Sequence, residues 1–210
     1  EASMFNFFVK KKFLVDYLDG FTDIHNHILP GIDDGAKNVE ESLNLITGMG
    51  AFGVKDFICT PHITENYYPN PPGTIKTALS VLENALKMEG LVDVTVRAAA
   101  EHMIDSGFEN LLNKKLTMQI SNQYILVEMS YLQASLNFEQ CISRLKEKGL
   151  FPIFAHPERY VYFKRNKNDY HRLKDLGMLF QLNLLSLSGY YGKEVNKKAI
   201  SLLEDNLIDF

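Results

Sequence analysis

Short apolar runs that each lead to a potential metal ligand recur along this chain and constrain its fold more than any other feature. The residues that close these runs are His25, His27, His62, Glu101, Glu128 and His156. They recur roughly every 27 to 39 residues, which is close to the length of one strand-plus-helix unit. Residues delivered once per unit, from the same end of successive parallel strands, can converge on one point.

The first two of these residues form a His-x-His pair at the end of the apolar run 21–24. In a strand, side chains at positions i and i+2 point the same way. His25 and His27 are therefore expected to leave the strand side by side, as a metal ion requires of its first two ligands. Such pairs also occur by chance on protein surfaces, so the prediction depends on the recurrence of further ligands.

The segments between the ligands predict alternating strands and helices. Strands are expected near residues 21–25, 54–59, 92–99, 124–127, 151–155, 179–184 and 207–210. Helices are expected from a cap at Asn38, over 74–89, 138–148, 168–176 and 193–205. Apolar strands that alternate with helices indicate a parallel sheet covered on the outside. Because ligands come from at least five strand ends, a closed or nearly closed βα barrel fits better than an open sheet, with its chemistry on the C-terminal rim.

Length and composition bound the remaining possibilities. The 210 residues suit one domain, expected over 21–210, preceded by an N-terminal extension over 1–20. A net charge of −4 gives no electrostatic case for nucleic-acid binding. No apolar stretch approaches the roughly 20 residues of a membrane span. The apolar segment 5–9 precedes the lysines at 10–12, which is the reverse of a signal peptide, so a cytoplasmic location is expected.

The two cysteines are expected to be structural, and the two other histidines are assigned no role. Cys59 and Cys141 are predicted to be buried reduced thiols rather than disulfide partners or metal ligands. His102 follows Glu101 directly and should point the opposite way. His171 falls in a predicted helix and is given no role.

The ligand set indicates the metal and the chemistry. Imidazoles and carboxylates without thiolate suit Mn, Fe or Zn, and six or seven ligands suggest two or three ions. The alternative is that Glu101 and Glu128 are salt-bridged structural acids. Clustered cations activate water and clamp the oxygens of a phosphoryl group. Arg159, three residues after His156, is placed to hold phosphate oxygens, although an ion pair with Glu158 is an alternative.

Several motifs together resemble the PHP (polymerase and histidinol phosphatase) superfamily. They are Asp23-Ile24-His25-Asn26-His27, Gly31-Ile32-Asp33-Asp34-Gly35, Thr60-Pro61-His62, Ala100-Glu101, Val127-Glu128 and His156-Pro157-Glu158-Arg159-Tyr160. The branch with the greatest similarity is the bacterial manganese-dependent protein-tyrosine phosphatases of capsule and exopolysaccharide synthesis. The resemblance implies a distorted (βα)7 barrel with up to three divalent ions, manganese in particular. It also implies a phosphotyrosine protein as substrate, with a bacterial tyrosine autokinase as the partner that the enzyme opposes.

The resemblance also implies residue roles. The first ion would be held by His25, His27 and Glu101, and the second by Glu101, Glu128 and His156. Asp34 and His62 would hold the third ion, and Arg159 would bind the substrate phosphate. The implied reaction is hydrolysis of phosphotyrosine by metal-activated water, without a phosphocysteine intermediate.

One departure from the family leaves other functions open. The family has an Asp-x-His after its seventh strand, whereas this chain ends at Phe210, within that predicted strand. The expectation is a barrel truncated in or just after strand seven, with one ligand missing from the first ion and one from the third. Alternatives are a PHP phosphatase for a small phosphomonoester such as histidinol phosphate, a nuclease-like relative, or an inactive scaffold of the capsule machinery. An amidohydrolase fits the two glutamates less well, and assembly into a homo-oligomer stays open.

Overall fold

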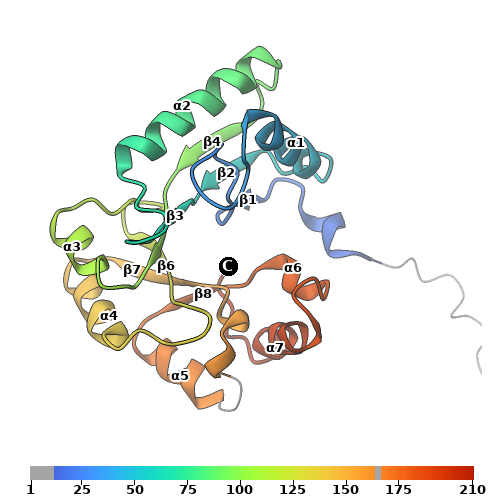
Figure 1. Ribbon diagram of the computed structural model, residues 1–210. Helices are drawn as coiled ribbons and strands as arrows, with labels where there is room; N and C mark the ends of the chain where they lie inside the picture. Colours follow the sequence, from blue (N-terminus) through green and yellow to red (C-terminus); the bar gives the residue numbers. More distant parts are fainter. Residues whose placement is uncertain (1–11, 164–166) are drawn as a thin grey trace, which may run out of the picture.

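Parallel strands in two sheets form the centre of the computed structural model, which describes residues 12–163 and 167–210 (Figure 1). The first sheet has the order β1-β2-β4, with β1 at Thr22–Asp23, β2 at Asp56–Cys59 and β4 at Thr95–Ala98. The second has the order β3-β5-β6-β7-β8, with β3 at His62–Ile63, β5 at Glu101–Met103, β6 at Tyr124–Glu128, β7 at Phe151–Ala155 and β8 at Leu179–Gln181. Every pairing between these strands is parallel, so their carboxyl ends lie at the same edge.

Helices follow most of the strands. They are α1 (Val39–Gly50), α2 (Pro72–Met88), α3 (Phe108–Asn113), α4 (Phe138–Glu147), α5 (Lys167–Asp175), α6 (Leu184–Leu187) and α7 (Lys193–Glu204). Figure 1 shows α1 and α2 beside the three-stranded sheet, and α4, α5 and α7 in the half of the molecule that holds β6, β7 and β8. The 3-10 helices η2 (Leu14–Tyr17), η3 (Pro157–Arg159) and η4 (Val161–Phe163) complete the elements described.

Each half of the molecule has its own apolar core. In the first, α2 presents Ile75, Ala78, Leu82 and Leu86 on one helical face to the strands. In the second, Phe154, Phe180 and Tyr160 are fully buried among residues of α4, α5 and α7. The predicted cap of α1 is confirmed, because the Asn38 side chain accepts from the Glu41 amide at 2.9 Å.

The strands expected over 54–59 and 92–99 are found as β2 and β4. Each is followed, where the chain passes to the other sheet, by a further short strand that was not expected, β3 and β5 respectively. Pro61 has no amide hydrogen and interrupts the ladder. Ala99 nevertheless donates to Cys59 O at 2.8 Å and Glu101 to Pro61 O at 3.0 Å, so backbone bonds continue from one sheet towards the next.

The last predicted strand, 207–210, is irregular in the structure but lies along β8. The amides of Asp209 and Phe210 donate to Phe180 O at 2.9 and 3.1 Å, and the Leu182 amide donates to Phe210 O at 2.9 Å. Closure of the strands into one distorted (βα)7 barrel stays a prediction.

Of the proposed N-terminal extension, residues 1–11 lie outside the described part, including the apolar segment 5–9. The remainder contains η2, after which Leu18 packs into the first core. Among the helices in the described ranges, none is long and apolar enough to cross a membrane.

Candidate metal centre

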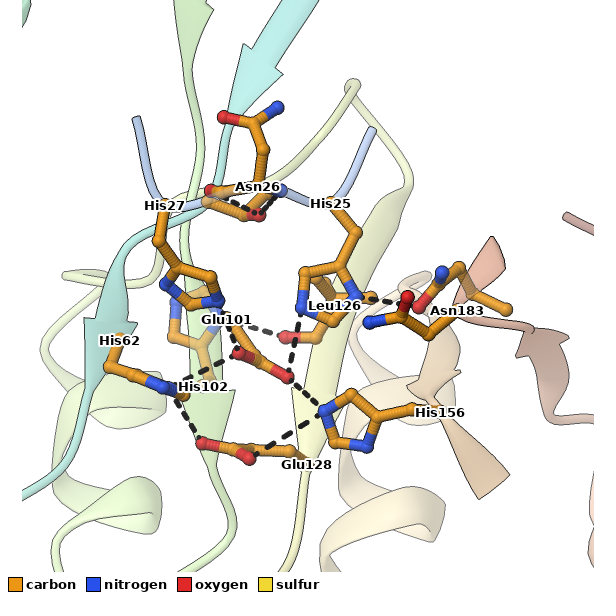
Figure 2. Close-up of polar contacts among 12 residues, drawn as sticks. His25, Asn26, His27, His62, Glu101, His102, Leu126, Glu128, His156 and Asn183 are labelled. Carbon is orange, nitrogen blue, oxygen red and sulfur yellow. Dashed lines mark hydrogen bonds and ion pairs between the residues drawn. The ribbon is translucent and has the colours of Figure 1, made fainter. Parts of the chain in front are cut away.

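The six predicted ligands that close or follow apolar runs converge in the structure, and Figure 2 shows their side chains turned towards one another. They come from different elements: His25 and His27 follow β1, Glu128 ends β6, and His156 follows β7. His62 and Glu101 begin β3 and β5 rather than ending longer strands, because the chain changes sheet just before each of them. The parallel register places them side by side, with His62 paired to Glu101.

Glu101 lies at the centre of the cluster. Its Oε1 is 3.2 Å from His25 Nε2 and 2.9 Å from His156 Nε2. Its Oε2 is 3.5 Å from His27 Nε2 and 3.1 Å from His62 Nδ1. The Glu101 side chain is fully buried, so four imidazoles surround one carboxylate that solvent does not reach.

Glu128 extends the cluster on the side of His62 and His156. Its Oε1 is 2.8 Å from His62 Nδ1, and its Oε2 is 3.9 Å from His156 Nε2. Asp34 reaches the cluster from its loop, with Oδ1 3.5 Å from His62 Nε2. In contrast to the buried glutamates, the Asp34 side chain is 64% exposed, so it lies where the cluster meets solvent.

Three groups of side chains in the described ranges have donor atoms close enough together to hold an ion: His25, His27 and Glu101; His27, Asp34 and His62; and His62, Glu101 and Glu128. The first group has the composition predicted for the first ion. In the third, His62 joins the two glutamates through Nδ1, whereas the prediction placed His156 there. His156 approaches the same two carboxylates through Nε2.

The orientation of the first two imidazoles fits metal binding. His25 Nδ1 is 2.6 Å from Gln181 Oε1, and His27 Nδ1 is 2.7 Å from Asp33 Oδ2. Because an Nδ1–H donated to these oxygens leaves the Nε2 lone pair free, both Nε2 atoms can act as ligands on the side of Glu101. The sequence analysis assigned no role to Gln181 or Asp33. Gln181 could have been found as a polar residue at the end of β8, and Asp33 as the first acid of the Asp-Asp-Gly motif.

Unsatisfied buried atoms support the same conclusion. Three buried atoms make no well-directed hydrogen bond with described residues: His62 Nδ1, Glu101 Oε2 and Glu128 Oε1. His62 Nδ1 nevertheless lies 3.1 Å from Glu101 Oε2 and 2.8 Å from Glu128 Oε1. Buried polar atoms are normally satisfied, and buried charges are normally paired or coordinate metals. The donor set therefore fits divalent cations.

The pKa values of the metal-free cluster reflect the crowding of charge. Burial lowers the pKa of His25 and His62, but the carboxylates of Glu101 and Glu128 outweigh burial and raise each pKa to about 9. For His156 burial prevails and its pKa is lowered. Burial raises the pKa of Glu101, but His25 and His156 hold it well below its usual range. The pKa of Glu128 is raised by burial and by the neighbouring charge of Glu101.

Backbone geometry around the ligands is unusual at two positions. A Cβ at Gly35 would lie 2.0 Å from His27 O, so only glycine allows the Asp-Asp-Gly loop to approach the ligand strand this closely. His156 has φ 35° and ψ 57°, in the left-handed region that few non-glycine residues adopt. Strain of this kind is concentrated at functional sites.

Arg159 lies beside the cluster rather than within it. Its Cζ is 4.5 Å from the centre of the Tyr131 ring and 4.2 Å from that of Tyr191. Tyr131 also contacts His156, with its hydroxyl 3.3 Å from Nε2, so one ring joins Arg159 to the cluster. The alternative ion pair with Glu158 is not observed among the described residues, since Glu158 Oε1 accepts from the Asn183 amide and the Ser186 hydroxyl.

The other histidines and the cysteines are not among the groups whose donor atoms could hold an ion in the described ranges. His102 is buried, with Nδ1 3.0 Å from Leu126 O and Nε2 accepting from the Met118 amide at 3.1 Å. His171 is exposed on α5. Cys59 and Cys141 are free and buried, and burial raises the pKa of their thiols to about 12 and about 11. Neither thiol is therefore an activated nucleophile.

Comparisons with known proteins identify the family of this chain. The pattern of the family described as "Capsular polysaccharide synthesis, CpsB/CapC" matches residues 21–210. The tyrosine-protein phosphatase YwqE of Bacillus subtilis (strain 168) is 32% identical over 189 residues, which cover 90% of this chain and 74% of YwqE. The tyrosine-protein phosphatase CpsB of Streptococcus pneumoniae is 28% identical over 192 residues, covering 89% of this chain and 79% of CpsB.

A solved structure extends the similarity to three dimensions. It belongs to the crystal structures of YwqE from Bacillus subtilis and CpsB from Streptococcus pneumoniae, described as unique metal-dependent tyrosine phosphatases. The superposition has a TM-score of 0.83 at 32% identity and covers 90% of this chain and 76% of the other. The likeness thus includes both the fold and the segments that carry the cluster.

Proposed function

Because this chain belongs to the CpsB/CapC family of capsular polysaccharide synthesis, we propose that it is a metal-dependent protein-tyrosine phosphatase. The observation that carries the proposal is the convergence of four imidazoles on the buried carboxylates of Glu101 and Glu128. The metal-dependent tyrosine phosphatases that share its fold support the same activity.

The cluster would hold up to three divalent ions. His25, His27 and Glu101 would hold one; Glu101, Glu128 and His156, with His62 close by, a second; and Asp34 and His62 a third. Manganese is the ion proposed, although Fe and Zn also suit nitrogen and carboxylate ligands. When bound, such ions supply Lewis acidity and a water of lowered pKa.

The other residues of the site would orient these ligands and the substrate. Asp33 and Gln181 fix the tautomers of His27 and His25. The Asp33 carboxylate also accepts from the amides of His62 and Gly35, so one side chain holds both the loop and a second ligand. Arg159 would bind two phosphate oxygens through its planar set of N–H donors.

The finer features of fold and context belong to the same proposal. The strands would close into a distorted (βα)7 barrel, which is supported by the backbone bonds that continue past Pro61 and by those from 209–210 to β8. The substrate would be a phosphotyrosine protein of the cytoplasm, a tyrosine autokinase of capsule or exopolysaccharide synthesis in particular.

A metal and thiol comparison tests the proposal. A chelator should abolish turnover of a phosphotyrosine peptide, added manganese should restore it, and the double variant Cys59→Ser, Cys141→Ser should keep its activity per folded molecule. Equal or faster turnover of a small phosphomonoester such as histidinol phosphate would instead favour a small-molecule phosphatase. Turnover that survives chelation, or that requires a thiol, would contradict the proposal.

A further inference from the structure

We propose that Tyr131 is a further substrate-contacting residue, whose ring positions Arg159 and whose hydroxyl donates a hydrogen bond to the phosphate group. The inference rests on the proposed function and adds a residue to it. Tyr131 lies three residues after Glu128, in the loop that follows β6. It contacts both parts of the site, the guanidinium of Arg159 and the ligand-type residue His156.

The loop that carries Tyr131 is held rigidly in place. The Met129 amide donates to the Tyr160 hydroxyl at 3.1 Å, and the Val161 amide donates to Tyr131 O at 3.2 Å. The Tyr131 ring stacks on that of Tyr160, with centroids 5.7 Å apart and an interplanar angle of 30°. Tyr160 is fully buried, so the ring of Tyr131 rests on the core. A side chain supported in this way is preorganised for a ligand.

The ring of Tyr131 fixes one part of the phosphate site by cation–π contact with Arg159. Tyr191 makes a second such contact, and its hydroxyl accepts from Asn183 Nδ2 at 3.4 Å. The buried carboxylate of Glu158, next to Arg159 in sequence, accepts from the Asn183 amide, which ties the Tyr191 loop to the Arg159 turn. Since aromatic rings contact a guanidinium through its face, its N–H edge stays available for an anion.

The hydroxyl of Tyr131 is placed for a second contact. It lies 3.3 Å from His156 Nε2, and that nitrogen also lies 2.9 Å from Glu101 Oε1. A cation bound at Nε2 would take the lone pair, so the phenol could no longer donate to it. An oxygen of a phosphate held by Arg159 would then be the alternative acceptor, since the same tyrosine contacts the guanidinium. A neutral phenol donates through its O–H.

Binding of inorganic phosphate to the manganese-loaded protein tests the hydroxyl without requiring turnover. Tyr131→Phe keeps the ring and should weaken phosphate binding about 10- to 100-fold, the usual effect of losing a hydrogen bond to a charged group, with metal content unchanged. Tyr124→Phe makes the same chemical change at the other end of β6 and should leave phosphate binding unaltered. Unchanged phosphate binding in Tyr131→Phe would overturn the role of the hydroxyl, and loss of metal would show that Tyr131 supports the metal centre instead.

A double-mutant cycle tests the ring. Tyr131→Leu should weaken phosphate binding more than Tyr131→Phe, and the additional loss should disappear in an Arg159→Ala background, because the ring acts through Arg159. The loss due to the hydroxyl should persist in that background. An additional loss that remains without Arg159 would refute the positioning role. Failure of phosphotyrosine turnover in the wild-type protein would count against the proposed function alone, since phosphate binding is measured separately.

Discussion

Buried polar side chains on the two sides of β5 differ in whether protein groups satisfy their hydrogen bonds. Glu101 points into the metal-binding cluster, where buried atoms of Glu101, Glu128 and His62 lack well-directed partners. Its neighbour His102 points away, and both of its ring nitrogens are satisfied by backbone groups. Adjacent residues on one strand therefore belong to different regions. In one region the protein satisfies the hydrogen bonds of the buried side chain, and in the other the side chains are suited to binding cations.

This difference distinguishes a structural polar residue from a functional one better than residue type does. Both regions use buried histidine, and Figure 2 places His102 near the cluster. Burial lowers the pKa of His102 to about 4, so it remains a neutral hydrogen-bonding group. The pKa of His25, equally buried, rises to about 9 because carboxylates face it. The variants described below should alter one region while leaving the other intact.

The largest effect is expected from Glu101→Gln. The change keeps the shape of the side chain but removes the charge that faces His25, His62 and His156. Turnover should fall on the order of a thousandfold or more, because a ligand shared between ions cannot be replaced by a neutral amide. Metal analysis should show lost ions, while circular dichroism stays native. Full metal content with full activity would remove Glu101 from the centre.

The next effect is expected from Arg159→Ala, at the border of the cluster. Losing a charge-assisted contact to phosphate should cost about 2–4 kcal/mol of transition-state stabilisation, or about 30- to 1000-fold in kcat/KM. Metal content should not change, because no described ligand contacts Arg159. Arg97→Ala is the matched control, since Arg97 forms a surface ion pair with Asp56. Loss of metal in Arg159→Ala would place it within the cluster instead.

The convergence of the ligand-type residues could be predicted from the sequence because these residues recur at regular intervals next to apolar runs. Each ligand-type residue stands beside an apolar run, and parallel pairing places them at one edge. The short strands β3 and β5, which follow residues 60–61 and 99–100, were not predicted, because they depend on which sheet each segment pairs with.

The supporting residues were also missed, for a related reason. Gln181 reaches His25 across 156 residues of sequence, and Tyr131 and Tyr191 come together from different loops at Arg159. No spacing rule encodes such contacts, because they depend on how loops from different strands fold back over the rim. Asp33 is the exception, since its place in the Asp-Asp-Gly motif was visible, but its role became clear only from its contact with His27.

A stability effect is expected on the other side of β5. His102→Leu should lower the free energy of unfolding by about 2–4 kcal/mol, because it removes the imidazole contacts to buried Leu126 O and to the part-buried Met118 amide. Urea unfolding measures the loss, and His171→Leu on the exposed face of α5 should change stability by no more than about 0.5 kcal/mol. Folded His102→Leu should retain its metal. A variant of normal stability that has lost its ions would reverse the assignment of the two regions.

The test that compares the two regions most directly is the pH dependence of stability in the metal-free protein. His25 and His62 have pKa values of about 9 when folded, against 6.5 for an ordinary histidine. The folded state therefore binds more protons between those values, and their stabilising contribution, complete below pH 6.5, is lost as pH rises towards 9. His102, with a folded pKa of about 4, has the opposite sign: the unfolded state binds the extra proton, so stability is lost as pH falls from 6.5 towards 4.

Urea unfolding at pH 5, 6.5 and 9 should therefore show two separable slopes. His102→Leu should reduce the acid slope, to which His156 with its lowered pKa also contributes, and should leave the alkaline slope unchanged, whereas His62→Gln should mainly reduce the alkaline slope. Saturating manganese should abolish or reverse the alkaline slope, because cations and protons compete for the same nitrogens. Of the two buried glutamates of the cluster, Glu101 with its lowered pKa and Glu128 with its raised pKa change stability with pH in opposite directions. If His62→Gln changed only the acid slope, the charges attributed to the cluster would be wrong, and with them the reason why this side of β5 requires metal ions.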